Sequence, residues 1–322
     1  MIERPSHSAA EKPGASDSQA GTLRGRIDEG TNDDGYFPRG RSALRMVHEE
    51  KVVGLMYGQR ALCVGAVKPL NYVGTSEHTR NKSTPFRRIT HTGGMFEAVF
   101  FGSRAQADRV LAAVDGMHER VVGELPHDAG PHHPAGTPYS AFDPKLMLWT
   151  VAVIADSAAW FYDRLVRPLT SEEREALWQD YLRFAELFKM PRSTAPATYR
   201  DFREWYEQQL AGPDLHLTDE ARFMGHASAF EIPMPSSRQL PKRLHDLVML
   251  GSLPERVREL YGLRYTSAHA TACTAVLASG RFARLLAPRS LTHGSCIPEF
   301  EMVAATERRR IERGQSTPQL AG

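Results

Sequence analysis

The chain has 322 residues, of which 41% are hydrophobic and 24% charged, and its formal net charge is +2. This composition is that of an ordinary globular protein, and the length allows one large domain or two smaller ones. The charge balance is too even for a nucleic-acid-binding protein, which needs a clustered basic face. The three cysteines, Cys63, Cys273 and Cys296, form no disulfide or zinc-binding pattern. We therefore expect no nucleic-acid partner.

Residues 1–41 are rich in Ser, Gly, Pro, Asp and Glu and hold few large apolar side chains. Such a segment cannot bury enough surface to offset its chain entropy, so we predict a disordered N-terminal tail. From Ser42, a candidate N-cap, apolar residues recur at helical spacing. The predicted domain covers 42–314, and 315–322 form a C-terminal tail. Because the start of the chain lacks the basic-then-apolar pattern of a secretory signal, we expect a cytoplasmic protein.

The middle of the chain alternates between helical patterns and irregular segments. Residues 69–94 are polar without a clear period, which predicts a long loop or a broken helix. A short apolar run follows over 95–101. Ser103 then caps a predicted helix that ends at Gly123.

Further along, every regular pattern is helical. Asp143 and the proline after it begin a long helix that reaches Val166. Its most apolar part, 146–161, contains Asp156 and is short for a membrane span, so we expect a buried helix and no transmembrane segment. Thr170 or Ser171 caps the next helix. Additional helical patterns cover 199–210, 240–250, 254–261, 268–286 and 299–313. The fold class is therefore all-α, as a single multi-helix domain.

Two groups of side chains are candidates for chemistry. His118 is the one imidazole on the apolar face of the helix after Ser103, an environment that suits an axial haem ligand. The alternative is a core histidine bonded to a backbone carbonyl. In the polar segment, Arg88, His91 and Thr92 combine a guanidinium, which suits a carboxylate such as a haem propionate, with groups that can donate to bound oxygen. The alternative for these three is a basic surface loop.

A third group, His127, His132 and His133, lies in a loop rich in Pro and Gly. Its spacing fits no familiar metal site, and we predict none there.

Read in order, short motifs along the chain resemble the catalytic domain shared by rubber oxygenase (latex-clearing protein) and the MpaB-type oxygenases. The pattern is an Arg-Ala-Leu turn after a glycine, Arg-x-x-x-Thr, Phe-Gly, His-x-x-Val-x-Gly, and Tyr-x-Ala-x-Asp-Pro before a helix rich in Leu and Trp. In this chain the motifs stand at 58–62, 88–92, 101–102, 118–123, 139–144 and 148–149. The resemblance extends over roughly residues 42–290.

This resemblance implies a globin-like helical domain that binds haem b non-covalently, with iron and dioxygen cleaving a carbon–carbon double bond. His118 would be the proximal iron ligand. Arg88 and Thr92 would line the distal side or hold the haem, and Arg88 is thus also a cofactor-binding candidate. His91 stands where rubber oxygenase has a distal lysine. Glu77 is the candidate for a glutamate that rubber oxygenase uses before the Arg-x-x-x-Thr motif, although its spacing is shorter than expected.

The chain departs from the family where many members have Trp-Val-His, since Trp149 is followed here by Thr150 and Val151. We expect a haem b-dependent oxygenase acting on dioxygen and a small hydrophobic, unsaturated substrate of isoprenoid or lipid type, with peripheral membrane contact left open. The alternative is a non-catalytic haem- or lipid-binding helical protein.

Overall fold

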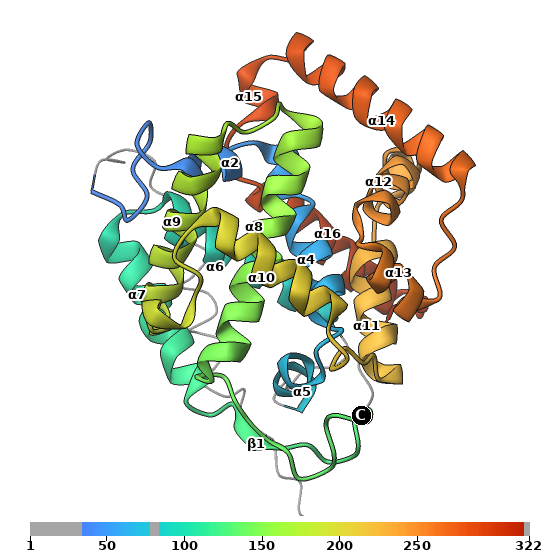
Figure 1. The fold of residues 1–322 in the computed structure, drawn as a ribbon. Coiled ribbons are helices and arrows are strands. Elements are labelled where there is room, and N and C mark those ends of the chain that lie inside the picture. Colours follow the sequence, from blue (N-terminus) through green and yellow to red (C-terminus); the bar gives the residue numbers. More distant parts are fainter. Residues whose placement is uncertain (1–33, 78–83, 319–322) are drawn as a thin grey trace, which may run out of the picture.

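The computed structural model describes residues 34–77 and 84–318, and these form a helical assembly around one long central helix, α8 (Pro144–Leu165) (Figure 1). Before it in the chain come α2 (Ala43–His48), α3 (Lys51–Gly54), α4 (Tyr57–Gly65), α5 (Pro69–Glu77), α6 (Pro85–Phe101), α7 (Arg104–His118) and the strands β1 (Val122–Glu124) and β2 (Pro138–Ser140). After it come α9 (Ser171–Leu187), η2 (Arg192–Thr194), α10 (Tyr199–Ala211), α11 (Asp219–Phe230), η3 (Ser236–Arg238), α12 (Gln239–Ser252), α13 (Glu255–Tyr261), α14 (Ser267–Leu286), α15 (Arg289–Thr292) and α16 (Ile297–Glu312). The all-α prediction is confirmed.

Helix α8 is central because it is apolar on nearly every side. Trp149 and Phe161 are among its buried side chains, and helices α3, α4, α9 and α14 all pack against it. Asp156 is the exception in this apolar run. It pairs with Arg60 of α4 (Nη1 to Oδ2, 2.8 Å) and with Arg203 of α10, so the predicted buried helix carries a compensated charge.

The predicted helix starts depend on local chemistry and are confirmed. Four side chains each accept a hydrogen bond from a backbone N–H in the first turn of the following helix: Ser42, Ser103, Asp143 and Thr170. Such caps satisfy donors that the helix itself leaves unpaired.

Three predicted boundaries differ from the structure. Phe37, inside the predicted tail, is buried against Phe100, so the packed part of the chain begins before Ser42; residues 1–33 lie outside the described part. The helix after Ser103 ends at His118 and not at Gly123, because the chain beyond it pairs with β2 in an antiparallel two-stranded sheet. The apolar run 95–101 is not a separate element but completes α6, whereas 69–94 contains α5 and the start of α6, as the broken-helix alternative predicted.

Among the described residues, no helix has the length and apolar character needed to cross a membrane. All three cysteines are buried and free of disulfides.

His48 makes the stability of the fold depend on pH. Its imidazole is buried, its Nε2 lies 2.7 Å from the hydroxyl of Tyr181, and burial lowers its pKa to about 3. The unfolded chain therefore binds more protons than the folded one between pH of about 6.5 and 3, and the free energy of unfolding falls as the pH falls through that range.

We predict that His48→Gln weakens this dependence by up to about 1.4 kcal/mol per pH unit. Denaturant titrations of both proteins between pH 7 and 4 measure it, and the difference between the two curves isolates His48 from other titrating groups. Parallel curves would show that His48 titrates normally in the fold.

Candidate functional site

The predicted site residues lie on two consecutive helices, α6 and α7, which pack against each other and are joined at Gly102 and Ser103. Arg88 precedes Gly102 by 14 residues and His118 follows Ser103 by 15. At a rise of 1.5 Å per residue, both lie about 21 to 22 Å along their helices from the shared junction. The sequence therefore places them at matching distances from the point where the helices meet.

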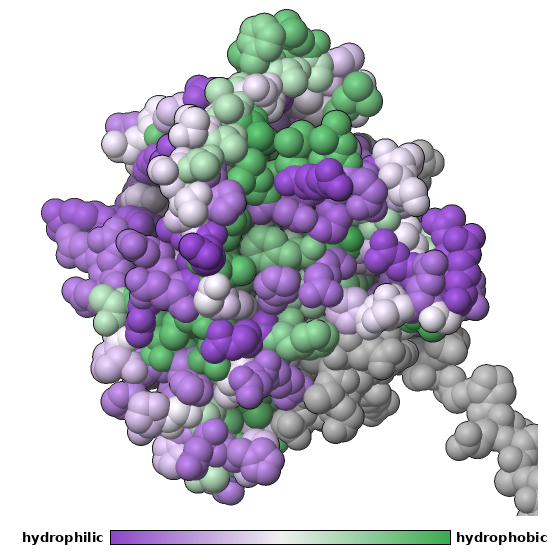
Figure 2. All heavy atoms as spheres, turned by 90° about the vertical axis from the view of Figure 1, so that its right-hand side faces the viewer, coloured by the Kyte–Doolittle hydropathy of each residue, from purple (hydrophilic) through white to green (hydrophobic). Residues whose placement is uncertain are grey.

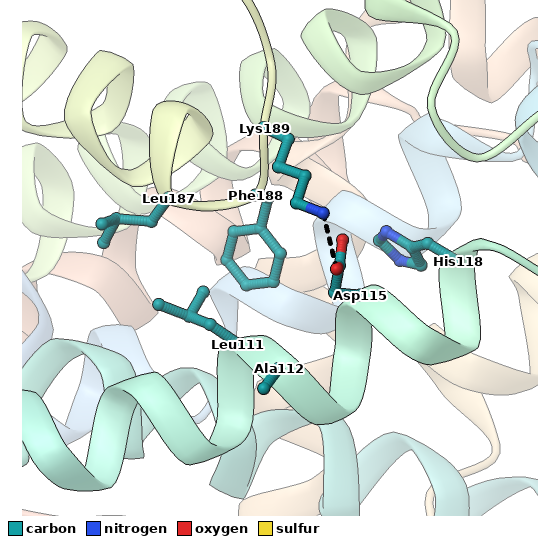
Figure 3. A pocket seen from close by; sticks show the side chains of 7 residues that line it. All are labelled: Leu111, Ala112, Asp115, His118, Leu187, Phe188 and Lys189. Atoms are coloured by element: carbon teal, nitrogen blue, oxygen red, sulfur yellow. Dashed lines mark hydrogen bonds and ion pairs between the residues drawn. The ribbon is translucent and has the colours of Figure 1, made fainter.

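His118, the last residue of α7, faces a small pocket with a volume of about 140 Å³ (Figure 3). The pocket walls come from α7 and from the end of α9: Leu111, Ala112, Asp115, Leu187, Phe188 and Lys189. The imidazole is half-buried, with the ring centroids of Phe142 and Phe188 at 5.8 and 6.5 Å. Burial lowers the pKa of His118, and nearby Asp115 opposes this. The neutral form, which can coordinate a metal, is thus favoured.

Within the part of the chain that the structure describes, the ring nitrogens of His118 have no hydrogen-bond partner. The alternative of a core histidine bonded to a backbone carbonyl is therefore not found there. The ring lies against the aromatic rings of Phe142 and Phe188, and its nitrogens are available to coordinate a metal ion.

Lys189 lies at the edge of this pocket and has an unusual backbone. Its φ is +69°, in the left-handed region that costs a non-glycine residue roughly 1 kcal/mol. This conformation ends α9, and the Lys189 ammonium lies 2.6 Å from the Asp115 carboxylate (Figure 3) and 5.7 Å from the Phe142 ring. The ion pair joins α9 to α7 one turn before His118.

On α6, Arg88 and His91 have different surroundings. Arg88 is largely buried, and desolvation lowers its pKa while the nearby Tyr72 of α5 opposes this. His91 is exposed. Thr92 is half-buried, and its hydroxyl donates to the carbonyl of Arg88 (3.1 Å). Arg88 thus lies on a helix, with its side chain partly buried, and not in a surface loop.

Helix α5 connects the surroundings of Arg88 to the segment after His118. Tyr72 neighbours Arg88, and a Cβ on Gly74 would lie 2.9 Å from the Val121 side chain, so α5 passes close to the chain just beyond α7. Glu77 is the last residue of α5. The role predicted for Glu77 depends on its side chain, which lies outside the described part.

Helix α16 holds α6 at both of its ends through two buried carboxylates. Glu307 of α16 accepts hydrogen bonds from the backbone N–H groups of Phe86 (3.0 Å) and Arg87 (2.8 Å). Glu97 of α6 accepts one from the N–H of Cys296 (2.7 Å), just before α16 begins. Each helix thus supplies an anion to the amino end of the other, where the helix dipole favours it. The two helices therefore run antiparallel, and α16 holds the turn that carries Arg88.

A single imidazole such as that of His118 suits haem iron better than mononuclear non-haem iron. A haem iron needs a single axial imidazole from the protein, whereas a mononuclear non-haem iron needs about three protein ligands. In residues 34–77 and 84–318 no three His, Cys, Asp or Glu side chains are grouped to hold a metal. The pocket beside His118 is smaller than the 300 to 1,000 Å³ of typical ligand sites, so it holds only part of a macrocycle.

The sequence did not reveal Phe142, Phe188, Asp115 or Lys189 as neighbours of His118. Of these four, only Asp115 could have been predicted from the sequence as a neighbour of His118, because it lies three residues earlier and thus on the same helix face. The others approach from separate elements.

Comparison with known proteins identifies the family. Residues 45–286, most of the chain, match the family described as ER-bound oxygenase mpaB/B'/Rubber oxygenase, catalytic domain, and the chain belongs to this family of oxygenase domains. Two similar proteins, one from Mycobacterium bovis and one from Mycobacterium tuberculosis, are each 24% identical over 233 residues, which is 72% of this chain and 86% of theirs. Both are described as uncharacterised. No solved structure matches the chain, and the globin-like arrangement stays a prediction.

We predict that Glu307→Ala lowers the free energy of unfolding by about 1 to 2 kcal/mol, since two backbone donors at the start of α6 lose their acceptor. Urea denaturation at pH 7 measures this, with Glu312→Ala, an exposed position on the same helix, as the control. Equal stability of Glu307→Ala and the control variant would contradict the capping role.

Proposed function

We propose that this chain is a haem b-dependent oxygenase in which His118 is the axial ligand of the iron. The observation that carries the proposal is the half-buried imidazole of His118, whose neutral form is favoured by burial and which has no hydrogen-bond partner among the described residues. It faces a pocket lined by Leu, Ala and Phe side chains and by the ion pair of Asp115 and Lys189. Membership of an oxygenase family supports the reaction class. A bound haem would supply the iron on which dioxygen is activated.

The protein would hold His118 in place through packing. The rings of Phe142 and Phe188 restrict the imidazole, and the ion pair between Asp115 and Lys189 fixes the turn of α7 before it. The two phenylalanine rings also limit water at the imidazole, which favours its neutral form and keeps it able to coordinate iron.

Arg88 would bind a haem propionate. Its guanidinium is largely buried on α6 and thus desolvated, so a carboxylate at this position would form a strong, charge-assisted hydrogen bond. Thr92, one turn later on α6, would face the same side as Arg88. The exposure of His91 favours a role at the mouth of the distal side, such as a hydrogen bond to an entering ligand.

The proposed substrate is a small hydrophobic molecule with a carbon–carbon double bond, of isoprenoid or lipid type, cleaved by dioxygen. We assign Glu77 to the same site, as a candidate base at the end of α5.

The first prediction concerns the iron ligand. The wild-type protein, purified after haem supplementation, is expected to show a Soret band with the signature of histidine ligation. His118→Ala should lose that signature, and added imidazole should restore it by occupying the vacated space.

His226→Ala is the matched control, because this imidazole is 41% exposed on α11, on the opposite side of the molecule from α7 (Figure 1). Absence of a Soret band in the reconstituted wild type would refute the haem proposal. An unaltered spectrum of His118→Ala would refute the ligand assignment alone. Haem binding without oxygen consumption on any unsaturated terpenoid or lipid would favour a non-catalytic haem protein.

The second prediction separates haem anchoring from ligation. Arg88→Met should weaken haem binding by roughly tenfold to a hundredfold while leaving the axial signature unchanged, since only a propionate contact is lost. Haem titration measures this, with the adjacent and exposed Arg87→Met as the control. Equal affinities of the two variants would remove Arg88 from the site.

A further inference from the structure

Helix α14 is poorly covered by the rest of the described structure. It has 20 residues, yet Cys273 is its one buried residue, and its main contacts are with α8 and α12 along one side. With the short α15 it forms an arm along one edge of the molecule (Figure 1). A soluble helix normally presents polar residues on such an open side.

The open side of this arm is apolar at its far end. Phe282, Leu285 and Leu286 are 64%, 68% and 72% exposed, and Leu291 of α15 is 69% exposed. The first three are spaced three and four residues apart and thus share one helix face. Figure 2 shows hydrophobic side chains gathered at the upper end of the molecule, where α14 meets α15. We call these four residues the apolar tip.

The chain segment that carries the apolar tip has charged side chains of one sign only. From residue 260 to residue 298 the sequence contains no Asp or Glu, and three arginines lie at the tip, Arg281, Arg284 and Arg289. Arg284 is paired with Glu50, while Arg289 is exposed. Glu50 itself is buried, so the exposed charges on this segment are arginines. Large apolar side chains bordered by exposed arginine are typical of surfaces that insert into anionic lipid.

We propose that the apolar tip docks this protein on a membrane surface that contains anionic lipids. Its four large side chains would enter the boundary between headgroups and acyl chains, and Arg281 and Arg289 would contact lipid phosphates. A second copy of the chain fits this surface poorly, because a twofold interface would place the arginines of one tip against those of the other. The inference needs no haem and stands apart from the proposed function.

Vesicle flotation with the full-length protein tests the proposal. The wild type is expected to float with vesicles of phosphatidylcholine mixed with phosphatidylglycerol, and less with phosphatidylcholine alone, and salt should weaken the binding. Leu285→Asp combined with Leu286→Asp should reduce binding at least roughly tenfold, since both side chains lose their apolar insertion. Arg281→Gln combined with Arg289→Gln should cost about fivefold for each arginine, and only on the anionic vesicles.

The control is Phe223→Asp, an exposed apolar residue on α11, which should bind vesicles as the wild type does. Because all substituted side chains are at least partly exposed, circular dichroism and thermal melts should be unchanged. The proposal is overturned if the wild type floats with neither vesicle, or if the leucine variant binds as the wild type does. A wild-type dimer that this variant converts to a monomer would likewise overturn it and assign the tip to a protein interface.

Discussion

The structure depends on a single carboxylate in the middle of its most apolar helix. Asp156 of α8 can be buried only because Arg60 of α4 and Arg203 of α10 reach it, and Arg60 also donates to the carbonyl of Ser252 at the end of α12 (2.9 Å). An unpaired charge at this depth would cost several kcal/mol, so these four helices have to meet at one point. These contacts fix the position of α8. Phe142 lies just before the cap residue of α8 and packs beside His118, so the position of α8 also determines this part of the His118 surroundings.

Local chemistry made much of the fold predictable, whereas long-range contacts did not. Asp143 could be recognised as a cap because its partners are its immediate neighbours in the chain. The hydrogen bond between Glu307 and the start of α6 joins residues more than 200 positions apart, and no local sequence pattern predicts it. Likewise the positive φ of Lys189 depends on how α9 ends against α7. At the site, the apolar helix face marked His118, but its aromatic neighbours come from other elements.

The proposed cofactor pocket and the proposed membrane-docking tip lie at opposite ends of α8. Phe142, beside His118, precedes its first residue, and Gly280 of α14 packs on Leu165 at its last turn. A helix of 22 residues is about 33 Å long, so docking would hold the protein at the membrane with His118 away from the lipid.

The most direct test of the account is the position of the iron. A crystal of the haem-reconstituted protein, measured at the iron absorption edge, would give an anomalous difference map in which iron alone dominates. The account predicts one peak within bonding distance of a ring nitrogen of His118, in the pocket between α7 and the end of α9. A peak bound by any other side chain, or no peak in crystals of protein with a full Soret band, would contradict it.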